Sequence, residues 1–514
     1  MKPLARQRFP LVVALLLAAG GAVFLACGVV VGIDLPAEAC DAAACDEGAP
    51  VEESSSADAF VASMDGFIST SDASDAHDAS DADVDAKAPL PLLPCDDGGL
   101  PGALDPTFGD GGRAYVDPIS GFGSAVVIQP DGKVVLGGAG QGTPPERFRM
   151  ARLTASGGLD IAFGDGGVIN TLLQGTGGDL TALAVTGDGR ILAGGHRRLD
   201  AGNSDDVAVA RYRGDGALDG TFGDGGVFAG FGAAGYAHLN SLAVLPDGHV
   251  LAAGHLGDAL SAGALIAKLN PDGSLDTTFG AGGKVRVDLR SYNTARAMIL
   301  QPDEKILAVG NCFSMVPTPP SPGLSGLFAV RLNADGSLDP SFGSGGKVVL
   351  ALGPTTESGA TAVALDAAGR IVLGGWTKAF TGKTDFAVFR LTPTGALDST
   401  FGSGGVVSVD FGDSDYIIHG GIYIQPDGKY LAVGRSSQPS GGLDTLVRLL
   451  PNGSADLGFG TGGRVVVPNP TGFYVLSGAA AFVGGRATLA GDWTPVVGGV
   501  PAGAVRMGAS RYCL

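Results

Sequence analysis

The segment LDPSFGSGGKV, Leu338–Val348, belongs to a motif that occurs seven times in this chain of 514 residues. The motif phenylalanines are Phe108, Phe163, Phe222, Phe279, Phe342, Phe401 and Phe459. They are separated by 55, 59, 57, 63, 59 and 58 residues. Near-equal spacing over seven copies is typical of a repeat protein.

The glycines of this motif resemble a phosphate-binding loop only superficially. A P-loop requires a following Lys-Ser/Thr pair and a helix. In the quoted copy Gly345 and Gly346 lead instead into KVVLAL, a predicted strand. We therefore expect Gly343, Gly345 and Gly346 to supply turn conformations that other residues avoid.

Each repeat is predicted to form four short strands without helical periodicity. In the second repeat these are GVIN (167–170), TALAVTG (181–187), RILAGGH (190–196) and VAVARYRGDG (207–216). The abundance of glycine, 87 residues, together with 45% hydrophobic residues, fits short strands joined by tight turns. Four strands in each of seven repeats predict an all-β fold, a seven-bladed β-propeller of four-stranded blades.

The pattern R-L-N-x-D-G-S-L-D-x-S-F-G-x-G-G-K-V, with an upstream Q-P-D-G-K, resembles the bacterial delta-60 repeat, a β-propeller family of unassigned function (DUF5122). The resemblance covers about Gly102 to Leu514. It implies a propeller fold, and it brings no catalytic residues to carry over to this chain.

The two ends of the repeat region complement each other. The C-terminal RYC followed by DDGGLPGALDPTFG (96–109) resembles the unbroken RYRGDGALDGTFG (211–223). The first strand, near Arg113–Asp117, is therefore expected to complete the C-terminal blade and close the ring. This closure would also bring Cys95 beside Cys513, and an exported protein can keep such a disulfide.

A basic residue stands eight residues before the motif aspartate in six repeats. The pairs are Arg152–Asp160, Arg211–Asp219, Lys268–Asp276, Arg331–Asp339, Arg390–Asp398 and Arg448–Asp456. Arg511 and Asp105 would form a seventh pair across the junction. We interpret the pattern as a repeated structural ion pair, or as aspartates that satisfy turn amides beside separately exposed basic residues. Catalysis rarely needs seven identical sites.

Residues 1–33 combine a basic start with an apolar run, which is typical of a secretory signal. FLAC ends at Cys27 and resembles a bacterial lipobox, in which the cysteine is acylated. Alternatively, Leu11–Ile33 contains no charge and is long enough to remain as a membrane anchor. Both interpretations predict export, attachment to a membrane through a lipid or a helix, and a location at the bacterial outer membrane or cell surface.

The net charge of −19 is unevenly distributed. Residues 34–94 contain 15 acidic residues and one basic residue, Lys87, and are predicted to form a disordered tether. Because the first 33 residues carry three basic residues, the remaining propeller, residues 95–514, has a net charge of −8. A body that is weakly acidic lacks the basic surface of a nucleic-acid-binding protein.

No cysteine has the spacing of a zinc site, and no cofactor is predicted. Cys40 and Cys45 are close enough in sequence to pair locally, which would leave Cys312 without a partner.

One position at the end of the third predicted strand changes its chemistry from repeat to repeat. It is occupied by Ala139, His196, His255, Asn311, Trp376, Arg435 and Trp493. Aromatic residues and arginine are enriched in binding hot spots. We therefore treat the six residues from His196 to Trp493 as candidate ligand-binding residues on the face of the variable loops. The alternative is a loop entrance that is free to vary.

These features favour a binding scaffold for an unidentified extracellular glycan or protein. An extracellular propeller enzyme, such as a lyase, lactonase or hydrolase, would need converging histidines and carboxylates. His196 and His255 recur at equivalent positions, but the sequence identifies no carboxylate beside them. No catalytic residue and no metal site is therefore predicted. A purely structural envelope protein is the third possibility.

Overall fold

The structure is a computed structural model. It describes residues 100–120, 123–139, 147–173, 175–199, 204–231, 236–258, 261–314, 325–350, 352–353, 356–379, 382–412, 414–438, 441–471, 473–497, 500–501 and 504–514. The predicted signal or anchor (1–33), the predicted tether (34–94) and Cys95 lie outside this part of the chain. Within it, no helix has the length and apolarity needed to cross a membrane.

The described residues form only strands and their connections, which confirms the all-β prediction. The strands are β1 (Arg113–Ser120), β2 (Ala125–Ile128), β3 (Val134–Ala139), β4 (Phe148–Leu153), β5 (Val168–Thr171), β6 (Gly177–Val185), β7 (Ile191–Arg198), β8 (Asp205–Tyr212), β9 (Val227–Ala229), β10 (Tyr236–Val244), β11 (Val250–Gly257), β12 (Ala262–Leu269), β13 (Lys284–Val287), β14 (Tyr292–Leu300), β15 (Ile306–Phe313), β16 (Gly326–Leu332), β17 (Lys347–Leu350), β18 (Thr356–Leu365), β19 (Ile371–Ala379), β20 (Thr384–Leu391), β21 (Val406–Val409), β22 (Ser414–Ile424), β23 (Tyr430–Gln438), β24 (Gly441–Leu449), β25 (Arg464–Val467), β26 (Phe473–Val483), β27 (Arg486–Val497), β28 (Val500–Pro501) and β29 (Arg506–Cys513).

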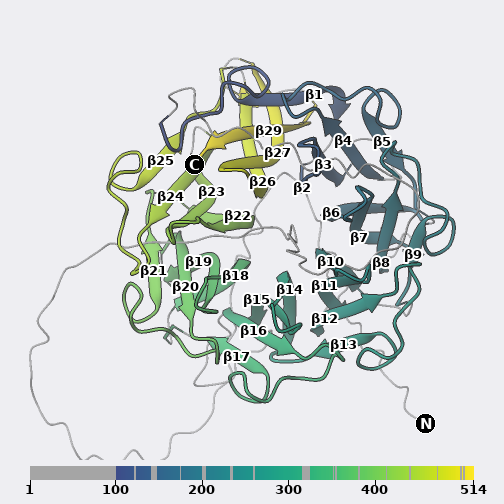
Figure 1. Ribbon diagram of the computed structural model, residues 1–514. Helices are drawn as coiled ribbons and strands as arrows, with labels where there is room; N and C mark the ends of the chain where they lie inside the picture. The colour runs from purple at the N-terminus through teal and green to yellow at the C-terminus, as the bar shows by residue number, and fades with distance from the viewer. Residues whose placement is uncertain are drawn as a thin grey trace, which may run out of the picture. The chain divides into compact units, whose positions relative to one another are not determined.

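Consecutive strands pair antiparallel in groups of four. The groups are β2–β5, β6–β9, β10–β13, β14–β17, β18–β21 and β22–β25, followed by β26, β27, β29 and β1. In each group the first strand lies nearest the centre and the fourth lies at the periphery (Figure 1). The predicted four-stranded units are therefore present.

The strand that follows each motif belongs to the sheet of the repeat before it. β17 directly follows the quoted motif and pairs with β16, so the motif connects the third and fourth strands of one sheet. β1 also follows a copy of the motif, and it pairs with β29, the last strand of the chain. The paired residues are Arg113↔Ser510, Ala114↔Ala509 and Tyr115↔Gly508. The N-terminal strand thus pairs with the C-terminal strand, as the sequence predicts.

The motif joins neighbouring sheets. Phe342 is fully buried, and the Arg331 guanidinium lies 4.6 Å above the centre of its ring. The Arg331 Nη1 group donates to the Pro393 carbonyl of the next repeat at 2.7 Å. The Gly343 amide donates to the Thr394 carbonyl at 2.8 Å. The positive φ angles of Gly343, Gly345 and Gly346 (54°, 58° and 87°) confirm their predicted turn role.

The predicted ion pairs are all present, at N–O distances of 2.7 to 3.0 Å. They are Arg152–Asp160, Arg211–Asp219, Lys268–Asp276, Arg331–Asp339, Arg390–Asp398, Arg448–Asp456 and, across the two chain ends, Arg511–Asp105. In five of the seven pairs a hydroxyl two residues after the aspartate donates to the same carboxylate, as Ser341 does to Asp339 at 2.7 Å. The interpretation as a repeated structural ion pair is therefore confirmed. The aspartates also accept turn amides, as Asp339 does from Ser341, but the expectation of separately exposed basic residues is wrong, because the six motif arginines are buried.

The hydrophobic core lies between neighbouring sheets. In one cluster Phe342 and Val348 of the sheet β14–β17 are buried together with Val363 and Leu373 of the sheet β18–β21. Each sheet therefore buries its apolar face against the next sheet, and this burial is the main favourable contribution to folding.

Two of the cysteines lie in the described part of the chain. Cys513 is in a disulfide. Its predicted partner, Cys95, lies outside the described residues, as do Cys40 and Cys45, so these pairings stay predictions. Cys312 is a free, buried thiol. Burial raises the pKa of Cys312 to about 11, which keeps the thiol protonated and unreactive at neutral pH.

Candidate functional site

The innermost strands carry a β-bulge at a common level. The pairing register shifts between Leu180 and Ala182 in β6, Leu239 and Ser241 in β10, Ala295 and Ala297 in β14, Ala360 and Ala362 in β18, Ile417 and Ile422 in β22, and Ser477 and Ala479 in β26. A bulge leaves its extra residue outside the ladder and redirects the side chain, and bulges are common beside functional sites.

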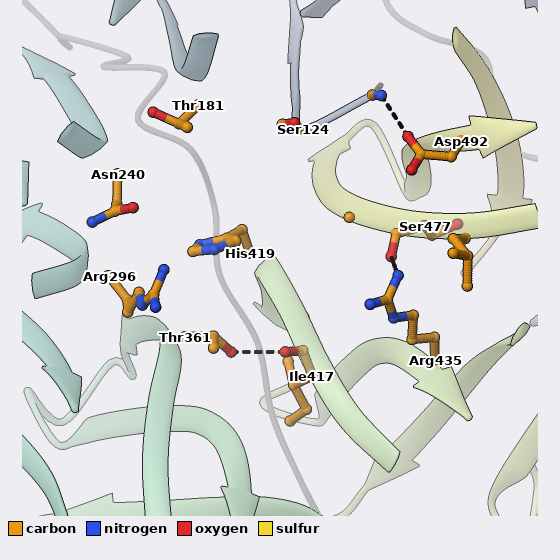
Figure 2. A pocket seen from close by; sticks show the side chains of 13 residues that line it. Ser124, Thr181, Asn240, Arg296, Thr361, Ile417, His419, Arg435, Ser477 and Asp492 are labelled. Atoms are coloured by element: carbon orange, nitrogen blue, oxygen red, sulfur yellow. Dashed lines mark hydrogen bonds between the residues drawn. The ribbon is translucent and has the colours of Figure 1, made fainter. Parts of the chain in front are cut away.

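The bulged residues line a single cavity of about 490 Å³ (Figure 2). Its walls are Gly123, Ser124, Thr181, Asn240, Arg296, Thr361, Ile417, His419, Arg435, Leu476, Ser477, Gly478 and Asp492. Ser124 immediately precedes β2, in a sheet for which no bulge is defined. The cavity is therefore built where the innermost strands of several sheets meet, and its size is within the usual range of small-molecule sites, roughly 300–1,000 Å³.

Three of the bulged side chains connect one innermost strand to the next. Thr181 Oγ1 donates to the Leu239 carbonyl at 2.5 Å, and Thr361 Oγ1 donates to the Ile417 carbonyl at 2.8 Å. Asn240 Nδ2 donates to the Ala295 carbonyl at 2.9 Å. These bonds satisfy carbonyl groups exposed by the bulges, so the three residues also stabilise the wall of the cavity.

Arg296 differs from the other bulged residues because it brings a charge into the cavity. Its Nε donates to Asn311 Oδ1 at 3.3 Å, and no carboxylate of the described residues lies within 4.0 Å of its guanidinium. Loss of water around the side chain lowers the pKa of Arg296 below its usual value. Beside it, burial and the charge of Arg296 lower the pKa of His419 to about 4, so this imidazole is neutral at pH 7.

Arg435 and Asp492 lie on the opposite side of the cavity (Figure 2). The Arg435 Nη1 group donates to the Ser477 carbonyl at 3.5 Å. Asp492 accepts a hydrogen bond from the Gly123 amide at 2.7 Å. Burial raises the pKa of Asp492 to about 6, although the Gly123 amide and the charge of Arg435 act in the opposite direction. The cavity thus contains two guanidinium groups and one carboxylate of weakened acidity.

The candidate residues of the sequence lie within the second strand of each sheet. Ala139 ends β3, and each of the others pairs with a residue of an innermost strand. These pairs are His196↔Asp179, His255↔His238, Asn311↔Thr294, Trp376↔Gly359, Arg435↔Tyr416 and Trp493↔Val475. Arg435 lines the cavity, and Asn311 contacts Arg296, which also lines it. The structure therefore places one of the six in the cavity wall and a second in contact with that wall.

The two tryptophans are packed against glycine and aromatic residues. Trp493 is 2% exposed, and its ring centre lies 5.7 Å from that of Phe473 and 6.0 Å from that of Tyr115. A Cβ atom at Gly359 would lie 2.7 Å from Trp376 Nε1, so this indole rests on the backbone of β18. The Trp493 ring has no open face on which a sugar could stack, and His196 and His255 are also buried.

A second polar cluster joins the sheets β6–β9 and β10–β13. The rings of His196 and His238 are stacked with centres 4.0 Å apart, and His255 lies 4.9 Å beyond His238. Asp205 Oδ2 lies 2.9 Å from His238 Nε2. One possible ligand atom from each of His196, Asp205 and His238 lies within 4.8 Å of the other two. The carboxylate and the third histidine were both missed in the sequence.

The chain has the architecture of a β-propeller, in which four-stranded antiparallel sheets repeat around a centre. Six segments match the family described as a domain of unknown function (DUF5122) beta-propeller, at residues 129–163, 186–222, 245–279, 323–342, 369–401 and 425–459. The chain belongs to this family of DUF5122 β-propellers.

The comparisons with other known proteins find only distant similarity. No curated protein matches the chain. A protein of unknown function from Dyadobacter fermentans DSM 18053 is 13% identical, with 80% of this chain and 100% of the other covered and a TM-score of 0.41. The polysaccharide lyase Uly1 is 11% identical, with 78% of this chain and 92% of the other covered and a TM-score of 0.44. An alpha-L-arabinanase of Penicillium chrysogenum, complexed with arabinobiose, is 13% identical, with 64% of this chain and 91% of the other covered and a TM-score of 0.38. Similarity at this level carries no argument about function.

Proposed function

We propose that this propeller is a binding module whose central cavity takes a small anionic ligand rich in hydroxyl groups, such as the acidic sugar at the end of a polysaccharide. The observation that supports it best is Arg296, a guanidinium in the cavity wall with no carboxylate within 4.0 Å in the described part of the chain. A cation that has lost water without gaining a counter-ion is costly, and a ligand carboxylate would relieve this cost through charge-assisted hydrogen bonds.

The uncharged groups of the wall suit the hydroxyls of such a ligand. Thr181 and Thr361 already donate their hydroxyl hydrogens to backbone carbonyls, so their oxygen lone pairs remain as acceptors. The amide nitrogen of Asn240 is used in the same way, which leaves its amide oxygen as an acceptor. A ring of acceptors around a guanidinium matches a molecule that offers hydroxyl donors and one carboxylate.

Replacing Arg296 with glutamine tests the proposal. We expect an oligogalacturonate probe to bind the full-length protein in isothermal titration calorimetry, and the Kd to rise at least about tenfold in Arg296→Gln. This rise corresponds to the loss of a hydrogen bond to a charged group, about 1.5–3 kcal/mol. Arg213→Gln is the matched control, because Arg213 is exposed and does not line the cavity. Equal affinity in Arg296→Gln and the wild type, or no binding of the acidic probe by the wild type, would contradict the proposal.

Asp492 predicts the pH dependence of the same binding. Because its pKa is raised to about 6, this carboxylate is charged at pH 7.5 and mostly neutral at pH 5. The His419 pKa of about 4 keeps that side chain mostly neutral at both values, and a sugar carboxylate stays charged. Removing one negative charge from the cavity wall favours an anionic ligand by on the order of 1 kcal/mol, so the acidic probe should bind about fivefold more tightly at pH 5. In Asp492→Asn this pH dependence should disappear.

We also propose that the sheets form a closed ring of seven blades, with β1 completing the C-terminal blade. The pairing of β1 with β29 and the ion pair between Asp105 and Arg511 support this closure.

The proposed setting of the module is the bacterial outer membrane or cell surface. Its support is the sequence alone: the signal-like residues 1–33, with Cys27 as the acylated residue or the apolar run as an anchor, and the acidic segment 34–94 as a tether. Labelling of cells with radioactive palmitate would distinguish the two attachments, because only the acylated form loses both label and membrane association in Cys27→Ala.

A further inference from the structure

The histidine cluster beside the cavity is made by side chains from two sheets. His196 comes from β7, Asp205 from the start of β8, and His238 from β10 of the next sheet. β8 and β10 contact each other in parallel where Asp205 pairs with Tyr236, two residues before His238. The cluster is therefore fixed by the joint between two neighbouring sheets, and its position does not depend on a loop.

The cluster has hydrogen-bonding capacity that the protein does not use. His196 is 5% exposed and His255 is 9% exposed, and the Nδ1 atom of each is buried without a hydrogen-bond partner among the described residues. Asp205 Oδ1 is also buried without a hydrogen bond. Buried polar atoms in proteins are nearly always satisfied, so a concentration of unsatisfied nitrogen and oxygen atoms points to a missing ligand.

The chemistry of these groups is that of a transition-metal site. Two imidazoles and one carboxylate form the ligand set of many catalytic zinc sites, which keep a further position open. Asp179 Oδ2 lies 3.9 Å from His196 Nε2, where it can orient the imidazole as a supporting carboxylate.

Two features of the cluster set the conditions for binding. Arg198 Nε lies 3.7 Å from Asp205 Oδ1 and must move aside, which its partly exposed side chain (32%) allows. A metal ion lies in the plane of each imidazole that binds it, so the stacked rings of His196 and His238 cannot both bind without rotation. His238 is the ring that must turn within the stack when the metal binds, because its side chain is 27% exposed while that of His196 is 6% exposed.

We propose that His196, His238 and Asp205 bind a divalent transition-metal ion of the zinc class. The site is separate from the anion-binding cavity and does not depend on the function proposed for it. It lies close to that cavity, because His238 and the cavity residue Asn240 are both on β10.

Zinc titration of the full-length protein, after dialysis against EDTA, tests the site. We expect His238→Phe and Asp205→Asn each to bind one zinc equivalent fewer than the wild type in isothermal titration calorimetry. Phenylalanine keeps a ring that can stack on His196, and asparagine keeps the shape of Asp205, so both variants preserve the packing. His249→Ala is the matched control, since His249 lies outside the cluster. The aspartate-rich residues 34–94 are the same in every variant, so zinc bound there cancels in the comparison.

Thermal unfolding followed by circular dichroism provides the second measurement. Zinc should raise the melting temperature of the wild type and of His249→Ala by several degrees, and it should leave that of His238→Phe and Asp205→Asn unchanged. If either variant has lost its native spectrum, the other one decides the outcome. The same number of zinc equivalents in the wild type and in a folded cluster variant overturns the proposal.

Discussion

Replacing Arg390 with methionine should lower the free energy of unfolding by about 3–5 kcal/mol, because it leaves the carboxylate of Asp398 without its buried counter-ion. Arg390 is 1% exposed. Its Nε lies 2.8 Å from Asp398 Oδ2, and its Nη2 donates to Thr400 Oγ1 at 3.0 Å. Its Nη1 also donates to the Pro451 carbonyl of the next repeat. The substitution therefore removes a salt bridge within one sheet and a hydrogen bond to its neighbour.

Urea unfolding followed by circular dichroism gives the measurement, and two further variants make it specific. Arg213→Met removes a pair whose side chains are 54% and 62% exposed, so its effect on the free energy of unfolding should be small. The double variant Arg390→Met/Asp398→Leu should recover much of the lost free energy of unfolding, because neither charge of the pair is then left buried without the other. A loss below about 1 kcal/mol in Arg390→Met would mean that water solvates the pair, and the structural role of the motif would have to be abandoned.

The fold could be predicted because the repeated residues are those that join the sheets. The spacing of eight between Arg331 and Asp339 brings the two side chains together across the turn that follows β16, and the same turn buries Phe342. These contacts use one motif and one neighbouring turn, so their geometry is the same in every repeat. Because this spacing occurs seven times, it indicates a structural role for the motif, which a single copy would not indicate.

The cavity could not be predicted in the same way because it depends on pairing register. Within HLNSLAV (238–244) the polar residues Asn240 and Ser241 stand between Leu239 and Leu242, which interrupts the alternation of a regular strand but does not show which residue is the extra one. A bulge reverses the alternation of side chains beyond it. The bulged residue is the fifth or sixth of the innermost strand and is Thr181, Asn240, Arg296 and Thr361 in successive repeats. Its variation within a nearly constant apolar frame is the signal that the sequence contains.

The histidine cluster could not be predicted from the sequence either, because it depends on contacts between neighbouring repeats. His196 and His255 can be recognised as candidates because they occupy equivalent positions of the repeat. The cluster is completed by His238 and Asp205, which occupy two other positions of the repeat. Their meeting depends on the contact between β8 of one sheet and β10 of the next. Repeat alignment compares equivalent positions, so it does not reveal contacts between unlike positions of neighbouring repeats.

Replacing Asp105 with alanine should destabilise the protein more than any equivalent change at another motif aspartate, because Asp105 has two buried counter-ions. It is 1% exposed, and both Arg486 Nε and Arg511 Nε lie 2.7 Å from its Oδ2. Asp456 is the matched position, with Arg448 at 2.8 Å and the partly exposed Lys429 at 3.4 Å. We expect a loss of about 5 kcal/mol in Asp105→Ala and about 3 kcal/mol in Asp456→Ala, measured by urea unfolding at pH 7.

The pH dependence of the difference between these variants follows from the same contacts. Burial alone would raise the pKa of Asp105, but hydrogen bonds from Thr107 and Arg486 lower it to about 2. A carboxylate with a lowered pKa stabilises the folded state above its unfolded pKa, about 3.9, and this contribution is lost as the pH falls towards 2. The wild type should therefore approach the stability of Asp105→Ala between about pH 4 and pH 2.

Reducing the disulfide of Cys513 distinguishes two causes of the lost stability in Asp105→Ala: opening of the ring and local loss of an ion pair. The Asp105 backbone lies where the chain ends meet, since the Gly102 amide donates to the Cys513 carbonyl at 2.7 Å and the Cys513 amide donates to the Ala103 carbonyl at 2.9 Å. If Cys95 is the disulfide partner of Cys513, the cross-link holds these ends together in Asp105→Ala. Adding dithiothreitol should then enlarge the loss in Asp105→Ala while the loss in Asp456→Ala stays the same. Equal losses in the two variants, with and without reductant, would show that the ring is not held closed at this junction, because Asp105→Ala weakens the contact between the two ends of the repeat region whereas Asp456 lies within a continuous repeat.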